Sequence, residues 1–269
     1  EHIIYFSGVL KSYCKFSIIM TICVVLVSSC QSYKIVDANS SILEIDKNLT
    51  ELEFKEIELS KFRDSISKEM NKIINYCLIS MEVGCPEGIL GNFISDLAIL
   101  YIRKNFPEND FNPDFCILNN GGFRSTLNKG TITVGDIFQI MPFDNHLLIL
   151  EINGKEMKDL INYIKDKSTT NISRKSGVPL SGIRLKISGD KVNRCMINNK
   201  TYDPLKTYKV LTTNYLASGG DNMYFFKNCK NILNTKLLLR DLIIRYIEEL
   251  GMNNIKINAQ LDGRVQIIQ

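Results

Sequence analysis

The chain has 269 residues, of which 45% are hydrophobic and 23% charged, and its formal net charge is +4. This composition is that of an ordinary globular protein with one large domain or two small ones. The charge is mild and no dense block of lysine and arginine is present, so a nucleic-acid-binding function is not expected.

The N-terminal thirty residues have the pattern of an export signal. Lys11 and Lys15 precede an apolar run over residues 16–26, which is too short for a spanning helix but typical of a signal peptide. The run ends in small residues before Cys30, which resembles a bacterial lipoprotein cleavage box. We expect a signal peptide over 1–30, lipidation of Cys30, and an exported protein in the cell envelope. A plain signal peptide or a short anchor helix are the alternatives.

The chain after this signal divides into a polar tether over 31–50 and a folded domain over 51–269. The domain has an odd number of cysteines and no Cys-x-x-Cys spacing, which argues against a disulfide scaffold. The sequence also contains no zinc-site signature. Cys77 and Cys85 are near enough in sequence to pair. The others are expected to be scattered buried thiols.

Hydrophobic periodicity predicts helices and strands interleaved along the domain. The expected helices cover residues 61–77, with Ser60 as a cap, and 86–105, 134–140, 154–164 and 235–250. The expected strands cover residues 114–118, 147–152, 182–187, 194–197, 208–215 and 264–268. This order favours a single α+β domain with mixed sheets.

The first stretch with chemical character follows the strand at 114–118. An Asn-Asn-Gly-Gly loop allows positive φ and close approach of the backbone to a ligand, and Arg124 adds a charged fork suited to phosphate or carboxylate. Thr133 can cap the next helix and Pro142 ends it, which leaves Phe143 in a loop. The simpler interpretation is a turn with a solvated arginine and a core phenylalanine.

A second stretch, residues 212–221, repeats this arrangement. A strand runs into a Gly-Gly loop, with Tyr215 before the loop and Asp221 after it. Together the two stretches resemble the C-terminal, substrate-binding domain of the 5′-nucleotidase family, through its Asn-x-Gly-Gly-x-Arg, Gly-x-Ile-Thr, Pro-Phe-x-Asn and Asn-[Phe/Tyr]-Leu-Ala-x-Gly-Gly-Asp segments. The resemblance covers about residues 36–269 and implies a layered α/β/β/α core.

The resemblance also implies a set of substrate-binding residues, each of which has an ordinary structural alternative. Phe143 and Tyr215 would clamp a nucleobase, although most aromatics pack in cores. Asp221 would accept hydrogen bonds from ribose hydroxyls, or it stabilises a turn. The remaining implied contacts are Arg124 to phosphate, Asn119 and Asn145 to base or sugar, and Gly182 in the base pocket, where a strand bulge explains a glycine equally well. Asn92, in a Leu-Gly-Asn segment, is expected either to face the substrate or to pack in the contact of its helix with the fold.

Two departures from the family limit what the resemblance implies. The position seven residues before Gly91, where the family usually has a phosphate-binding arginine, is Gly84. The family's catalysis also belongs to a metallophosphatase domain with two metal ions, and this chain has only two histidines, His2 and His146.

We therefore expect no catalytic residue, no metal site and no cofactor in this chain. The expected function is substrate recognition in a split 5′-nucleotidase whose metallophosphatase subunit, with its divalent metals, is a separate polypeptide. A non-catalytic cell-surface lipoprotein that binds nucleosides or nucleotides is the alternative, and a domain with a purely structural role is a third.

Overall fold

The computed structural model describes residues 56–107, 112–170 and 172–268, which belong to one compact unit, Phe54–Gln269. The expected signal peptide (1–30), the tether (31–50) and Cys30 lie outside the described residues. Among the helices in these ranges, none combines the length and hydropathy needed to cross a membrane.

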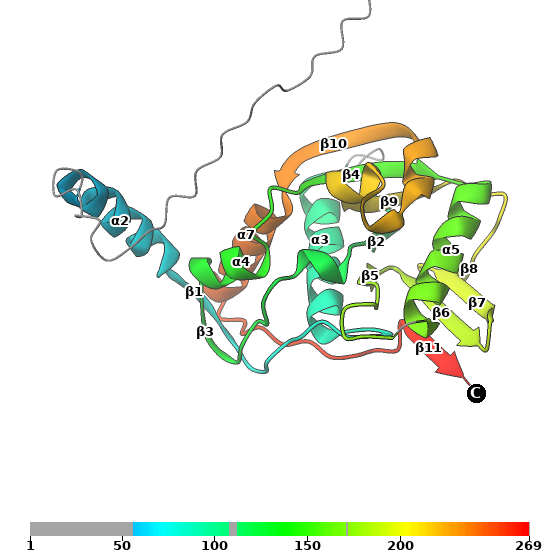
Figure 1. The fold of residues 1–269 in the computed structure, drawn as a ribbon, viewed down its shortest axis with the longest axis horizontal. Coiled ribbons are helices and arrows are strands. Elements are labelled where there is room, and N and C mark those ends of the chain that lie inside the picture. Colours follow the sequence, from blue (N-terminus) through cyan, green and yellow to red (C-terminus); the bar gives the residue numbers. More distant parts are fainter. Residues whose placement is uncertain (1–55, 108–111, 171, 269) are drawn as a thin grey trace, which may run out of the picture. The chain divides into compact units, whose positions relative to one another are not determined.

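In the described part of the chain, helices and short 3-10 turns alternate with strands that form three sheets (Figure 1). The helices are α2 (Glu56–Met70), α3 (Ile89–Asn105), α4 (Val134–Ile140), α5 (Gly154–Thr169), α6 (Asn214–Ala217) and α7 (Leu239–Met252). The 3-10 turns are η3 (Asn120–Gly122), η4 (Gly220–Asn222) and η5 (Tyr224–Asn228).

The central sheet has the strand order β10 (Lys230–Leu238), β4 (His146–Ile152), β9 (Tyr208–Thr213), β2 (Phe115–Ile117) and β5 (Leu180–Ser181). A second sheet has the order β11 (Val265–Ile268), β6 (Ile183–Ser188), β7 (Lys191–Ile197) and β8 (Lys200–Thr201). The smallest sheet pairs β1 (Ile73–Cys77) with β3 (Gly130–Thr133).

Strand alternation divides the core of the unit into two layers. Side chains at alternate positions of a strand point to opposite faces of its sheet. On one face of the central sheet, Cys116, Ile149 and Leu211 are buried in a cluster with α3 and α7, which lie next to each other (Figure 1). On the other face, Ile117 and Leu150 are buried with α5 and the four-stranded sheet. This arrangement confirms the α+β fold with mixed sheets in layers.

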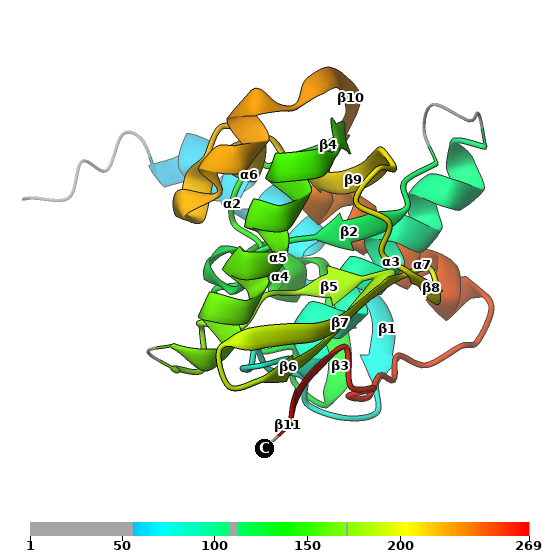
Figure 2. The ribbon, with the colours of Figure 1, turned by 90° about the vertical axis from the view of Figure 1, so that its right-hand side faces the viewer.

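Figure 2 shows α5 and the β6–β7 hairpin in front of the central sheet. Helix α5 covers this face because its apolar residues recur at helical spacing, and Met157, Leu160 and Ile164 are fully buried in the second cluster. The sheet therefore has both faces covered.

Most of the elements expected from the sequence are present with small shifts of their ends. The capping of α4 is confirmed: the Thr133 hydroxyl accepts from the Asp136 N–H at 3.2 Å, and the Asp136 carboxylate accepts from the Thr133 N–H at 2.8 Å. The five cysteines of the described ranges are free, so Cys77 and Cys85 are not paired.

The prediction of a helix over 61–77 is wrong for the second half of this range. Helix α2 ends at Met70, Ser60 lies inside it rather than at its cap, and Ile73–Cys77 forms strand β1 against β3. The burial of β1 alternates in its last part, with Tyr76 exposed and Cys77 buried. Pairing with a distant strand therefore overrides a pattern that also satisfies helical spacing.

Two further boundaries differ from the expectation. The helix expected from residue 235 begins only at Leu239, because β10 continues to Leu238 along β4, where the Thr235 hydroxyl donates to the Leu147 carbonyl at 2.8 Å. The strand expected to reach Tyr215 ends at Thr213, whose hydroxyl accepts from the Leu216 N–H and caps α6.

Candidate functional site

Three neighbouring strands of the central sheet bring the two Gly-Gly stretches to one edge. Strand β9 is parallel to β2 and antiparallel to β4. The C-terminal ends of β2 and β9 therefore meet the N-terminal end of β4 at the same edge. The loop after β2 carries residues 119–124, the loop before β4 carries 142–145, and the segment after β9 carries 214–222. The topology alone explains why segments far apart in sequence meet here.

A cavity of about 340 Å³ lies at this edge. Its lining residues are Asn119, Gly121, Gly122, Arg124, Phe143, Asn145, Tyr215 and Asp221. Six of the seven residues implied as substrate contacts are thus brought together around one cavity. Phe143 and Tyr215 are 43% and 44% exposed, so neither is a core residue. The cavity combines two aromatic side chains with amides, one carboxylate and one guanidinium.

The Asn-Asn-Gly-Gly loop is compact because its glycines lie against polar side chains. A Cβ at Gly122 would come within 3.1 Å of the side-chain Oδ1 of Asn119, and one at Gly121 within 3.3 Å of its side-chain Nδ2. The same amide donates a hydrogen bond to the Asp221 carboxylate. The next residue, Asn120, is buried and donates to the Gly84 and Gly177 carbonyls at 3.0 and 2.7 Å.

The loop with Phe143 is fixed by the start of α7. The Arg240 guanidinium donates to the Asp144 carboxylate at 2.7 Å, and the Leu239 N–H donates to the Asn145 carbonyl at 2.9 Å. Arg240 is only 8% exposed and stacks over the Phe138 ring at 4.3 Å from its centroid. These contacts place Phe143 at the mouth of the cavity without burying its side chain.

The segment with Tyr215 and Asp221 requires glycine for two reasons. Gly219 has φ +93°, in the left-handed region. A Cβ at Gly220 would lie 2.5 Å from the Tyr215 ring, so the ring covers the backbone of this residue. Asp221 itself has φ +51°, and its carboxylate accepts from the Tyr215 hydroxyl at 3.3 Å. The carboxylate is therefore held from two sides, by Asn119 and by Tyr215.

Arg124 brings a positive charge to the cavity through an exposed side chain. Its backbone N–H donates to the Ile140 carbonyl at 2.9 Å. Gly84, which occupies the family's usual arginine position, has no room for a side chain. A Cβ there would lie 2.6 Å from the Glu87 carbonyl oxygen.

Gly182 lies apart from the other six residues. It lines a different cavity, of about 230 Å³, together with Arg184 and Asn198. Its φ is +78°, and a Cβ there would come within 2.7 Å of the Asp114 carbonyl oxygen. A backbone requirement next to β2 therefore accounts for this glycine. Asn92 also lies elsewhere: it is 2% exposed and donates to the Glu87 carboxylate at 2.9 Å.

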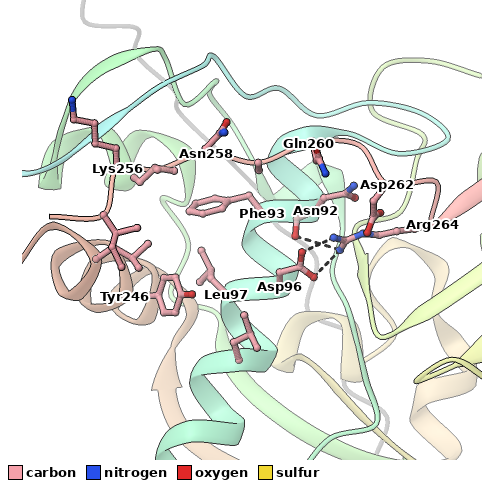
Figure 3. Close-up of a pocket in the computed structure, with 15 residues that line it drawn as sticks. Asn92, Phe93, Asp96, Leu97, Tyr246, Lys256, Asn258, Gln260, Asp262 and Arg264 are labelled. Atoms are coloured by element: carbon pink, nitrogen blue, oxygen red, sulfur yellow. Dashed lines mark hydrogen bonds and ion pairs between the residues drawn. The ribbon is translucent and has the colours of Figure 1, made fainter. Parts of the chain in front are cut away.

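A larger cavity, of about 470 Å³, lies between α3, α7 and the segment over 255–264 (Figure 3). Its most prominent charged group, the Arg264 guanidinium, is paired with Asp96 and donates to the Asp262 carboxylate at 2.8 Å. Figure 3 shows this guanidinium directed at Asp96 on α3. Because Arg264 is only 7% exposed and paired with protein carboxylates, its positive charge is already neutralised within the protein.

Within the described ranges, no group of three or more histidine, cysteine, aspartate or glutamate side chains is arranged to hold a metal ion. Sequence patterns did not indicate the contacts of Arg240 with Asp144 and of Tyr163 with Asp221. Each of these contacts joins residues that are distant in the chain, so it leaves no local pattern.

Comparison with protein families finds one matching model, described as 5′-nucleotidase, C-terminal domain, over residues 73–228. Among curated proteins, the chain is 24% identical to the trifunctional nucleotide phosphoesterase protein YfkN of Bacillus subtilis, over 85% of this chain and 16% of that protein. It is 27% identical to snake venom 5′-nucleotidase of Gloydius brevicauda, over 86% of this chain and 42% of that protein. The chain thus spans less than half the length of either relative.

Two solved structures are similar in fold. The 5′-nucleotidase precursor from Thermus thermophilus matches with a TM-score of 0.63 at 22% identity, over 80% of this chain and 43% of that one. The NAD nucleotidase of Haemophilus influenzae matches with a TM-score of 0.62 at 18% identity, over 78% of this chain and 40% of that one.

Proposed function

Since the chain belongs to the 5′-nucleotidase C-terminal domain family, we propose that it recognises the substrate in a split 5′-nucleotidase. In this proposal the chain binds a nucleotide or nucleoside, and a separate metallophosphatase subunit hydrolyses the phosphate ester. The chain then takes part in nucleotide catabolism without containing the catalytic metals.

The observation that carries the proposal is the pair of half-exposed aromatics, Phe143 and Tyr215, lining one cavity with Asp221 and Arg124. A nucleobase has two apolar faces, and each stack on an aromatic ring contributes about 1 to 3 kcal/mol. A carboxylate accepts hydrogen bonds from sugar hydroxyls, and a guanidinium pairs with phosphate oxygens. The cavity thus offers a matching group for the base, the sugar and the phosphate of one ligand.

The proposal of a separate catalytic subunit rests on the histidine content. A dinuclear metal site that polarises phosphate and generates hydroxide needs several histidine and carboxylate ligands. The chain has two histidines, and His146 lies at the start of β4 with its Nδ1 buried and without a hydrogen-bond partner among the described residues. Divalent metals are therefore assigned to the partner. The alternative is a binding lipoprotein that works without an enzymatic partner.

Titration calorimetry with adenosine monophosphate, adenosine and UDP-glucose tests the proposal. Saturable one-to-one binding of at least one of the three supports it, and their order identifies the preferred sugar and phosphate content. If none of them binds the chain, alone or with a metallophosphatase subunit added, the proposed recognition role is wrong. Binding without any gain of hydrolysis when such a subunit is added favours the binding lipoprotein.

We further propose that the protein is exported and anchored in the cell envelope through a lipid on Cys30. The support is the sequence pattern alone: a basic start, an apolar run over 16–26, and small residues before Cys30. With Cys30→Ser, the protein should move from the detergent phase to the aqueous phase in a partition assay. An unchanged partition would instead indicate that the uncleaved run over 16–26 is the anchor.

A further inference from the structure

We propose that Tyr163, on α5, is a positioning residue for the cavity at the sheet edge. In this inference, Tyr163 holds the backbone of Asp221 in its left-handed conformation and so directs the Asp221 carboxylate toward the sugar. The part that concerns the sugar rests on the proposed function, whereas the part that concerns the loop does not.

The segment around Asp221 is conformationally strained. Asp221 and the next residue, Asn222, have φ of +51° and +67°, and Gly219 before them has +93°. Aspartate and asparagine adopt this region more readily than other residues with a side chain, but still less readily than glycine. A segment of this kind keeps its conformation only when its surroundings hold it.

Tyr163 supplies one of these holding contacts from outside the cavity. Its hydroxyl donates to the Asp221 backbone carbonyl at 2.9 Å, although Tyr163 does not line the cavity. The ring is itself fixed: it meets Phe225 edge-on at 5.8 Å between centroids, and the Lys167 ammonium lies 5.5 Å from its centroid. Burial, and then the nearby Asp221 charge, raise the pKa of the Tyr163 hydroxyl, which therefore stays protonated as a donor.

The contacts on the other side of Asp221 have a different character. Asn119 and the Tyr215 hydroxyl both bond the Asp221 carboxylate, which is the group that would receive the sugar hydroxyls. A bound sugar competes with these two donors for the carboxylate lone pairs. The bond from Tyr163 goes to the backbone carbonyl and is compatible with a bound sugar. Tyr163 is thus one support that can act equally in the free and bound states, beside the bond from the Asp221 N–H to the Tyr215 hydroxyl at 3.3 Å.

Without the Tyr163 hydroxyl, the free energy needed to order the segment over 219–223 should be spent when the ligand binds. With one support lost, the segment over 219–223 samples conformations in which the carboxylate points elsewhere. Binding must then restore the productive conformation. The measured affinity is therefore reduced in proportion to the fraction of molecules that populate this conformation before binding. The effect should be confined to the sugar contact and to Tyr215, which bonds Asp221, since Phe143 and Arg124 are held by other elements.

The test uses Tyr163→Phe, which keeps the ring, with Tyr246→Phe as the matched control. Tyr246 lies on α7 and lines the other cavity (Figure 3). The first measurement is hydrogen exchange of the backbone amides over 219–223 in the free protein. Tyr163→Phe should raise their exchange about threefold to tenfold, as expected for one lost hydrogen bond, while the amides over 119–124 and the control remain unchanged.

The second measurement is the affinity for adenosine and for 2′-deoxyadenosine. Tyr163→Phe should weaken adenosine binding about threefold to tenfold and lower the ratio of the two affinities, with the unfolding midpoint close to that of the parent. Unchanged exchange over 219–223 overturns the inference, and faster exchange with an unchanged ratio overturns its sugar part. If the parent binds neither nucleoside, that result concerns the ligand of the proposed function and not Tyr163, and the exchange result still decides the role of Tyr163 in the loop.

Discussion

The side-chain amide of Asn119 donates a hydrogen bond to the carboxylate of Asp221, across 102 residues of the chain. This bond joins the loop after β2 to the segment after β9 at the edge of the central sheet. The two residues were expected to contact a ligand separately. Their contact means that Asn119 also orients the carboxylate, so their contributions to binding should be coupled.

A double-mutant cycle measures this coupling. We expect Asn119→Ala and Asp221→Ala each to weaken adenosine binding about tenfold, because each removes a hydrogen bond to or from a charged group. The double variant should lose little more than Asp221→Ala alone. Calorimetric affinities for the parent and the three variants give the coupling energy. Losses that add to within about 0.5 kcal/mol would show that the two side chains act independently.

The aromatic pair should contribute to binding without contributing to the core. Phe143→Ala and Tyr215→Ala should each weaken adenosine monophosphate binding by about 1 to 3 kcal/mol, the value of one lost base stack. Both variants should fold, because these side chains are 43% and 44% exposed. Phe62→Ala, at a 65% exposed position on α2, is the control. Parent-like affinity in both variants, or loss of their folded circular dichroism spectrum, would show that there is no base clamp.

Arg124 should distinguish a nucleotide from its nucleoside. Arg124→Ala removes a charge-assisted bond that only the phosphate can accept, so binding of adenosine monophosphate should fall about tenfold or more. Binding of adenosine should change by less than about twofold, since no charged bond is lost. Arg245→Ala, an exposed arginine of α7 outside the cavity, controls for net charge. Equal losses of affinity for the two ligands would show that Arg124 does not bind the phosphate.

Stability should fall at alkaline pH because of the thiol of Cys116. Burial in β2 is the largest cause that raises the pKa of this fully buried thiol. The thiol ionises in the unfolded chain at about pH 8.5 but stays protonated in the fold, so the stability it provides is complete below this pH and is lost as pH rises.

Cys116→Val isolates this effect. Between about pH 9.5 and 10.5, the free energy of unfolding of the parent should fall more steeply than that of the variant, by about 1.4 kcal/mol per pH unit. Urea unfolding at several pH values measures both slopes. The comparison uses slopes, so a constant difference in stability between the two proteins does not matter. Parallel slopes would mean that Cys116 ionises in the folded protein as in the unfolded chain.

The purified chain should release no phosphate from adenosine monophosphate when Mn²⁺ or Zn²⁺ is added. The reason is the content of two histidines, against the several that a dinuclear site requires. A colorimetric phosphate assay, with and without a chelator, measures this. Metal-dependent release that the chelator abolishes would locate the catalytic site in this chain.

Local patterns were sufficient for the loops of the candidate site. Glycine pairs, Pro142 and the Thr133 cap act within a few residues, so their effect on the backbone can be predicted from sequence. The same holds for the helix expected from residue 154, which is present as α5. The structure places the loops at one edge because β2, β9 and β4 are neighbours, and the strand order was not part of the sequence prediction.

Features that depend on distant partners were missed. Residues 73–77 satisfy both helical and strand patterns, and pairing with β3 decides between them. The supports of the cavity are also non-local: Arg240 reaches Asp144 across 96 residues, and Tyr163 reaches Asp221 across 58. Neither contact leaves a local signal, because an arginine after a strand and a tyrosine on an amphipathic helix are both common.

A crystal structure of the chain with adenosine monophosphate tests the central claim most directly. The account predicts that the adenine lies between the rings of Phe143 and Tyr215, that the ribose hydroxyls are within hydrogen-bonding distance of Asp221, and that the phosphate faces Arg124. Nucleotide bound instead in the cavity between α3 and α7, or a sheet-edge cavity left empty at saturating nucleotide, would contradict it.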